Sequence, residues 1–207
     1  MSFEVILASG SPRRRQLLQE AGVTFTVHVA DVDETLEPEE LAQPEEACRK
    51  LADRKAKAVV DQVLCDSEHP DRFVVLGSDT MVVCDGQIFG KPESNAHARG
   101  MLSQLAGRSH EVMTSVSLWD VSAPAEKDPQ FEVHSFVDVS MVTFKALTSQ
   151  DIDEYLAVGE SSDKAGAYAI QGQGARLVAG VQGSMDTVIG LPVERLMREF
   201  GSLLLGK

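Results

Sequence analysis

The sequence predicts an α/β fold, on the evidence of three features. Residues 73–84 are almost continuously apolar, which is typical of a strand buried on both faces. Residues 44–64 repeat apolar side chains at helical spacing. Residues 108–121 and 131–144 alternate apolar and polar side chains, which predicts two long antiparallel strands. Strands and helices of this length predict a sheet covered by helices.

The composition limits the classes of protein to which the chain can belong. Its 207 residues suit one domain, 1–207, or two small lobes that share a core. A formal net charge of −13 argues against a general binder of nucleic acid or anionic membrane. Neither a bilayer-spanning run nor a signal-peptide pattern is visible. Cys48, Cys65 and Cys84 are widely spaced and fit a reducing compartment. We therefore expect a cytoplasmic protein.

The first predicted strand and helix form a candidate anion site. Residues 3–7 are a short apolar run, Ser11 can cap the following helix, and Pro12 suits its first position. Arg13 and Arg14 then lie in the first turn, beside free backbone N–H groups. Cations in such a turn suit a phosphate, and the alternative is a solvated basic helix start.

A second short strand, residues 25–29, leads into an acidic loop. Asp33 and Glu34 lie in this loop, and carboxylates at such density usually form a solvated surface. The alternative is that one of them faces a metal ion held by phosphates, because hard cations prefer oxygen ligands.

The helix predicted over residues 44–64 carries a lysine in its apolar stripe. Lys55 lies on the same face as Leu51, Ala52 and Val59. A lysine there is costly unless its ammonium reaches solvent or meets an anion. The second alternative predicts that this helix contributes to a binding site.

The predicted core strand has a polar interruption between its two apolar halves. Gly77-Ser78-Asp79-Thr80 lies there, and an aspartate is disfavoured in strands and costly to bury. Asp79 is a candidate general base or metal ligand. The alternative is an aspartate that accepts hydrogen bonds from nearby backbone N–H groups.

A second lysine follows the turn predicted at Asp85-Gly86. Gly90-Lys91-Pro92 is not a P-loop, because the glycine spacing is one residue short and proline replaces the Ser or Thr. Lys91 is either a phosphate ligand or an ordinary surface lysine. Ser94 can cap the next helix, which should stop at Gly107.

The C-terminal third is rich in glycine between two predicted helices. Thr148 can cap the first of them, and Pro192 opens the second. Glycines allow close approach of the backbone to a ligand or another element. Gln171 lies in this region and offers both a donor and an acceptor, as reading a nucleobase edge requires. The alternative is a backbone-bonded turn residue.

Five short motifs stand in the order found in the Maf-like nucleoside triphosphate pyrophosphatases, which the chain resembles from about Val5 to Pro192. They are Ser9-Gly10-Ser11-Pro12-Arg13-Arg14, Leu51-Ala52 with Lys55-Ala56, Gly77-Ser78-Asp79-Thr80, Gly90-Lys91-Pro92 and Asp163-Lys164-Ala165-Gly166. The resemblance implies a twisted mixed sheet flanked by helices, in two lobes with a nucleotide-binding cleft. It also implies a homodimer.

The resemblance further implies cleavage of a nucleoside triphosphate between its α and β phosphates. Asp79 would activate the water, and Glu34 with Asp79 would hold Mg²⁺ or Mn²⁺. Lys55 and Lys91 would act with Asp79 in catalysis. The implied substrate-binding residues are Ser9, Arg13, Arg14, Thr80, Lys164 and Gln171.

The branch of the family that hydrolyses dTTP and UTP looks most similar, because Arg13, Thr80 and Gln171 match the positions that would read the base. One departure is visible at Met185 and Thr187, where the family commonly has an aromatic residue and an asparagine. The alternative function is a nucleotide-binding regulator of cell division that acts through protein contacts.

Overall fold

The computed structural model describes residues 3–124 and 127–206, and all seven strands in these residues belong to one long sheet. The predicted α/β class is confirmed. The strands are β1 (Phe3–Leu7), β2 (Thr26–Val27), β3 (Arg72–Cys84), β4 (Gln87–Phe89), β5 (Ser109–Ser122), β6 (Gln130–Phe144) and β7 (Val178–Gln182). The helices are α1 (Pro12–Glu20), α2 (Pro38–Leu41), α3 (Pro44–Leu64), α4 (Asn95–Leu105), α5 (Ser149–Leu156), α6 (Met185–Ile189) and α7 (Val193–Leu204), with 3₁₀ turns η1 (Ala165–Ala167) and η2 (Gly172–Leu177).

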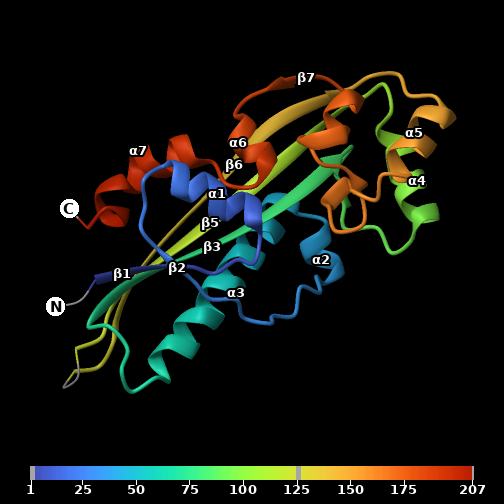
Figure 1. Ribbon diagram of the computed structural model, residues 1–207. Helices are drawn as coiled ribbons and strands as arrows, with labels where there is room; N and C mark the ends of the chain where they lie inside the picture. The colour runs from blue at the N-terminus through green and yellow to red at the C-terminus, as the bar shows by residue number, and fades with distance from the viewer. Residues whose placement is uncertain (1–2, 125–126, 207) are drawn as a thin grey trace.

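The sheet is mixed, with strand order β2-β1-β3-β5-β6-β7 and β4 paired to β3 (Figure 1). β1 runs parallel to both β2 and β3, whereas β3, β5, β6 and β7 run antiparallel in succession. The two long antiparallel strands predicted from alternation are β5 and β6, which pair along nearly their whole lengths. The turn predicted at Asp85-Gly86 joins β3 to β4, and both residues have positive φ as a tight hairpin requires.

β3 is unbroken, which confirms the core strand predicted over residues 73–84, and Gly77–Thr80 lies within it. Asp79 lies opposite Ser115 and Thr80 opposite Thr114 in continuous register with β5. Polar residues are tolerated here because β5 pairs with the backbone along one edge, while their side chains meet polar partners described below.

The other edge of β3 has a stretch without a paired strand. β1 ends its pairing at Leu7–Leu76, and β4 begins its own at Val82–Phe89. The residues between these points, 77–81, have β5 on one side only among the described strands. This gap lies beyond the carboxyl end of β1, where ligands commonly bind in α/β sheets.

Helices cover both faces of the sheet (Figure 1). α1 and α7 pack on one face, where Leu18 and Leu196 join the buried side chains of β3 and β5. α3 packs on the other, through residues such as Ala56 and Val59. The caps predicted at Ser11, Ser94 and Thr148 are confirmed, since each side chain accepts from a backbone N–H in the first turn.

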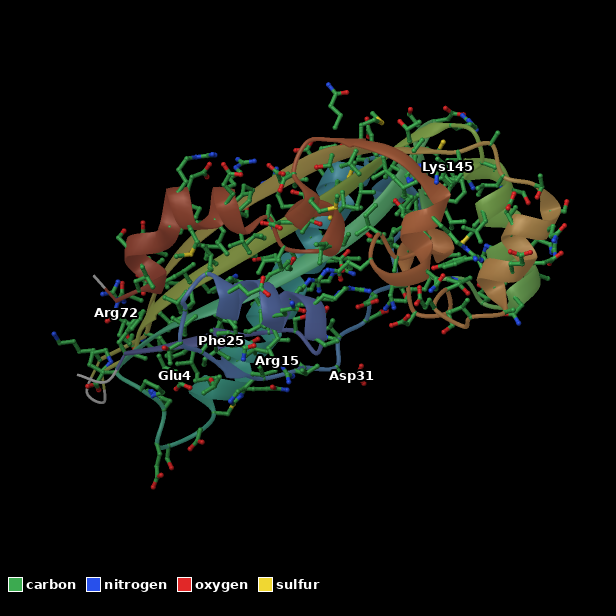
Figure 2. All side chains as sticks on the ribbon, turned by 45° about the horizontal axis from the view of Figure 1, so that its top comes forward. Glu4, Arg15, Phe25, Asp31, Arg72 and Lys145 are labelled. Carbon is green, nitrogen blue, oxygen red and sulfur yellow. The ribbon has the colours of Figure 1, made fainter. Side chains whose placement is uncertain are left out.

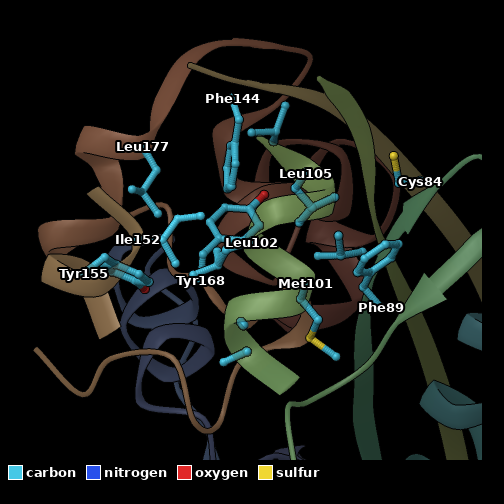
Figure 3. Packing of buried hydrophobic residues seen from close by; sticks show 14 of the residues in the cluster. Cys84, Phe89, Met101, Leu102, Leu105, Phe144, Ile152, Tyr155, Tyr168 and Leu177 are labelled. Carbon is cyan, nitrogen blue, oxygen red and sulfur yellow. The ribbon is translucent and has the colours of Figure 1, made fainter. Parts of the chain in front are cut away.

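A second lobe lies at one end of the sheet, where α4 and α5 stand together (Figure 1). Its core gathers Leu102, Leu105, Phe144, Tyr155 and Tyr168 around α4 (Figure 3). The lobe carries the glycine-rich segment 159–174 toward the gap in β3. No described helix is both long and apolar enough to cross a membrane.

Candidate active site

A cavity of about 800 Å³ opens over the gap in β3. It lies between the turn that begins α1, the loop after β2, and the segment 163–171 of the second lobe. Arg15 and Asp31 mark α1 and this loop in Figure 2. Five basic side chains (Arg13, Arg14, Lys55, Lys91, Lys164) and four acidic ones (Asp31, Glu34, Asp79, Asp163) line it. The cavity is therefore slightly cationic in a chain of net charge −13.

The structure brings every residue predicted for the site to this one cavity. These residues come from six separate stretches of sequence and two lobes, and the roles assigned to them are taken up below. They are Ser9, Arg13, Arg14, Glu34, Lys55, Asp79, Thr80, Lys91, Lys164 and Gln171.

A glycine allows α3 to approach the part of β3 that lines the cavity. A Cβ built on Gly77 would lie 2.3 Å from the Ala52 carbonyl oxygen and 2.8 Å from the Ala56 Cβ. No side chain fits such a gap, so glycine is required for this contact. The contact places Lys55, one residue before Ala56, against Asp79, two residues after Gly77.

The ammonium of Lys55 lies between two carboxylates. Its Nζ is 2.6 Å from Asp79 Oδ1 and 2.7 Å from Glu34 Oε1. Lys91 Nζ reaches the other oxygen of Glu34 at 3.3 Å. Burial raises the pKa of the Glu34 carboxyl, but the hydrogen bonds and charges of Lys55 and Lys91 outweigh burial and hold that pKa below its usual value. Of the two alternatives predicted for Lys55, an ammonium in solvent or one that meets an anion, the structure shows the second.

Arg14 is held on the opposite face of β3 from Lys55. Its Nε donates to the Gly190 carbonyl at 2.8 Å, Nη1 to Ser9 Oγ at 3.2 Å and Nη2 to Thr80 Oγ1 at 3.0 Å. Burial lowers the pKa of the Arg14 guanidinium from its usual value, while the charge of Asp79 acts in the opposite direction. Side chains alternate along a strand, so Thr80 points toward α1 and Asp79 toward α3.

Arg13 and the second lobe complete the lining. Arg13 Nε is buried and has no hydrogen-bond partner among the described residues, and a buried donor is normally satisfied. Lys164 forms an ion pair with Asp163. Gln171 lies just before η2, and no described residue forms a hydrogen bond with its side chain, so its amide is free to meet a ligand.

Arg54 holds the backbone around Glu34, which the sequence did not indicate. Its Nη1 donates to the carbonyl oxygens of Asp33 at 3.3 Å and Thr35 at 2.9 Å, the two residues that flank Glu34. Arg54 lies on the polar side of α3 in the sequence pattern, where a charge needs no special explanation. Its function becomes visible only once the loop is folded over the helix.

Comparison with known proteins shows the family to which this chain belongs. The family described as "Maf-like protein" matches residues 4–203. The chain belongs to the Maf-like family. A "dTTP/UTP pyrophosphatase" of Vibrio vulnificus is 42% identical over 200 residues, covering 95% of this chain and 98% of the relative. A "dTTP/UTP pyrophosphatase" of Bacillus cereus is 42% identical over 196 residues, covering 95% and 93%.

Among solved structures, the Staphylococcus aureus Ham1 protein matches with a TM-score of 0.41 and 16% identity, over 68% of this chain and 71% of that one. This likeness is too weak to support an argument. The resemblance to Maf-like proteins inferred from five motifs is confirmed by the family match and the two relatives.

Proposed function

We propose that this Maf-like protein hydrolyses dTTP and UTP to the nucleoside monophosphate and pyrophosphate. The observation that carries the proposal is the arrangement around β3. Arg14 lies on one face of the strand and Lys55 on the other, and both line the same cavity as Asp79. The names of the Vibrio and Bacillus relatives support the same reaction and substrates. Phosphoryl transfer depends mainly on positioning and on cations that stabilise negative oxygens, and this cavity provides both.

In the proposed reaction, Asp79 orients the attacking water and takes its proton. Its carboxylate is held by Lys55 at 2.6 Å, so one oxygen is fixed and the other is available to the water. Arg14, Lys55 and Lys91 bind the triphosphate oxygens, with Ser9 beside Arg14. The bond between the α phosphorus and the bridging oxygen breaks, and the pyrophosphate leaves with the charge that these cations stabilise.

Glu34 and Asp79 are the residues that would hold Mg²⁺ or Mn²⁺. Their carboxylates already stabilise one positive charge, the Lys55 ammonium, between them. Among the described residues no group of three or more His, Cys, Asp or Glu could hold a metal. Mg²⁺ binds through one or two carboxylates and takes its other ligands from phosphates and water. The ion would neutralise charge that develops on the phosphate oxygens.

Arg13 and Gln171 would bind the base, and Lys164 would contact the substrate beside them. Uracil and thymine present two carbonyl acceptors around one N3–H donor. The Gln171 amide can give one hydrogen bond and accept one along that edge. Arg13 lines the same cavity and has a buried N–H without a partner among the described residues, which supports a role as a donor. The sequence also placed Thr80 in base recognition, but its hydroxyl is bonded to Arg14.

We further propose that residues 1–207 act as one cytoplasmic domain that forms a homodimer. Phe131, Val133 and Val139 on β6 are 50%, 46% and 45% exposed, an apolar row that a second copy could cover. The three cysteines are free, in keeping with a reducing compartment. Light scattering on the purified protein would give twice the chain mass if the dimer proposal is right and the single mass if it is wrong.

The reaction is tested by incubating the purified protein with UTP or dTTP and Mg²⁺ and identifying the products. We expect monophosphate and pyrophosphate in equal amounts, and no product from a UTP analogue with a methylene bridge between its α and β phosphorus atoms. Orthophosphate with a nucleoside diphosphate would contradict the proposed bond cleavage. Nucleotide binding without any product would instead favour the regulatory alternative.

A further inference from the structure

Thr114 lies behind the site, on β5, in direct register with Thr80. It is fully buried and does not line the cavity. Its Oγ1 is 3.0 Å from Thr80 Oγ1 and 2.7 Å from the carbonyl oxygen of Thr187. A buried hydroxyl with two partners forms a fixed link between two parts of the structure.

The direction of these hydrogen bonds follows from counting hydrogens. A carbonyl oxygen only accepts, so the single hydrogen of the Thr114 hydroxyl goes to Thr187. Thr80 must then donate its own hydrogen to Thr114. A guanidinium only donates, so Arg14 gives a hydrogen to Thr80. The donors therefore run in one direction, from Arg14 through Thr80 and Thr114 to the Thr187 carbonyl.

This direction determines what each side chain can offer a ligand. The only hydrogen of Thr80 points into the protein, and one of its lone pairs is used by Arg14. Toward the cavity it has no donor left, so it cannot give a hydrogen bond to a base carbonyl. Arg14 has five N–H groups, of which three go to Gly190, Ser9 and Thr80. One N–H remains on each Nη, which suits two oxygens of a phosphate chain.

The acceptor at the end of this series is itself anchored. The Thr187 hydroxyl donates to Asp138 Oδ2 at 2.5 Å, and Arg195 of α7 lies 3.5 Å from the other oxygen of Asp138. Thr187 is one of the two positions where the chain departs from the usual family pattern. Its carbonyl therefore stays in place as an acceptor, and the series of hydroxyls does not rotate freely.

We propose that Thr114 is a positioning residue, which fixes the Thr80 hydroxyl as an acceptor and so orients the Arg14 guanidinium toward the triphosphate. The proposal rests on the proposed function for the identity of the substrate. Thr80 then contributes to phosphate binding through Arg14 and does not select the base.

The test compares Thr114→Val, which keeps the shape but removes the hydroxyl, with Thr114→Ser, which keeps the hydroxyl. We expect Thr114→Val to weaken the binding of inorganic pyrophosphate by up to about tenfold and to raise KM for UTP by a similar factor, the range for one lost hydrogen bond between neutral groups. Thr114→Ser should restore both values to near wild type. The ratio of kcat/KM for UTP to that for GTP should stay unchanged in both variants.

Thr143→Val is the matched control. Like Thr114, Thr143 forms a hydroxyl–hydroxyl hydrogen bond to the neighbouring strand, here from β6 to Ser109 on β5 at 2.8 Å. Neither Thr143 nor Ser109 lines the cavity. It should leave pyrophosphate binding unchanged even if it lowers the melting temperature. If Thr114→Val lowers only the melting temperature, Thr114 is structural and the proposal fails. A changed UTP to GTP ratio with unchanged pyrophosphate binding would also overturn it, because Thr80 would then act on the base.

Two further measurements keep the result interpretable. Pyrophosphate binding by calorimetry does not require turnover, so a protein whose pyrophosphate binding depends on the Thr114 hydroxyl but which cleaves no UTP would contradict only the proposed function. If Thr114→Val does not fold, Thr80→Val removes the same link from its other end. The expected loss of pyrophosphate binding is then the same, and unchanged binding overturns the proposal.

Discussion

The floor of the cavity and its rim are built in different ways. We define the floor as Ser9, Arg14, Lys55, Asp79 and Thr80, and the rim as Glu34, Lys91, Lys164 and Gln171. The floor residues lie on β3, on α1 and α3, or in the turn between β1 and α1, and Asp79 is only 8% exposed. The rim residues lie on loops, and the side chain of Lys91 is 62% exposed.

This difference between floor and rim suggests that the floor serves the chemical step and that the rim includes the residue that selects the nucleotide. Strand register and helix packing fix the positions of the floor side chains. Fixed positions suit the chemical step, because a small displacement of a catalytic group lowers the reaction rate. The rim depends on a few contacts between exposed groups, which are individually weak. We therefore expect floor variants to lower turnover of every nucleotide, and variants of Gln171 on the rim to change which nucleotide is preferred.

The largest effect is expected from Asp79→Asn on the floor. The substitution keeps the size of the side chain but removes the base, so turnover of UTP should fall by at least ~10²-fold. The fold should persist because Asn fits the same space and Lys55 keeps its contact with Glu34. Steady-state kinetics and a thermal melt of the same sample check both statements. Turnover near wild type in the folded variant would remove Asp79 from catalysis.

On the rim, Gln171→Glu should reduce pyrimidine preference. The change removes the amide donor and sets a carboxylate against a base carbonyl. We expect kcat/KM for UTP and dTTP to fall by a factor that corresponds to about 1–3 kcal/mol of transition-state free energy. This is the cost of leaving a polar group unpaired when it is buried against the base. GTP should lose less, because guanine presents donors along the same edge. Gln182→Glu, an equal charge change on β7 outside the cavity, is the control and should change neither value.

Gly77→Ala tests whether close packing of α3 on β3 builds the floor. The new Cβ would meet the Ala52 carbonyl, so α3 must shift, at a cost of about 1–3 kcal/mol of stability. The shift should also lower turnover of all nucleotides equally, because it moves Lys55 relative to Asp79. Gly100→Ala is the control. No atom lies within 4 Å of its added Cβ in α4, and it should be neutral or slightly stabilising. Equal melting temperatures for the two variants would show that the contact is not tight.

The smallest effect is expected from Arg54→Gln, which weakens the hold on the loop that carries Glu34. We expect the Mg²⁺ concentration for half-maximal activity to rise roughly three- to tenfold, since the lost bonds are partly exposed. Lys57→Gln removes an equal charge from an exposed pair with Asp61 on the same helix and should have no effect. If both variants behave alike, the loop is held by other contacts and Arg54 has no positioning role.

The sequence predicted most of the fold because the signals were local. The caps at Ser11, Ser94 and Thr148 and the extent of α3 depend on neighbouring residues, and they are confirmed. The core strand over residues 73–84 is also confirmed, and the polar side chains of Ser78, Asp79 and Thr80 are accommodated in it because they find partners from α3, α1 and the Gly190 loop. A sequence pattern carries no information on these partners.

The site was predictable only in part, for the same reason. Motif order indicated which side chains to consider, and the structure places them along one cavity, but it leaves their roles as proposals. Thr114 and Arg54 gave no signal, since a threonine in a strand and an arginine on the polar side of a helix are both ordinary. Their contacts with Thr80 and with the backbone around Glu34 join residues at least 19 positions apart.

The most direct test of the division between floor and rim is the ratio of kcat/KM for UTP to that for GTP, measured in wild type, Asp79→Asn and Gln171→Glu. We expect Asp79→Asn to lower both values by the same factor and leave the ratio unchanged. We expect Gln171→Glu to lower the ratio at least several-fold. A changed ratio in Asp79→Asn, or an unchanged one in Gln171→Glu with both substrates equally impaired, would contradict the division.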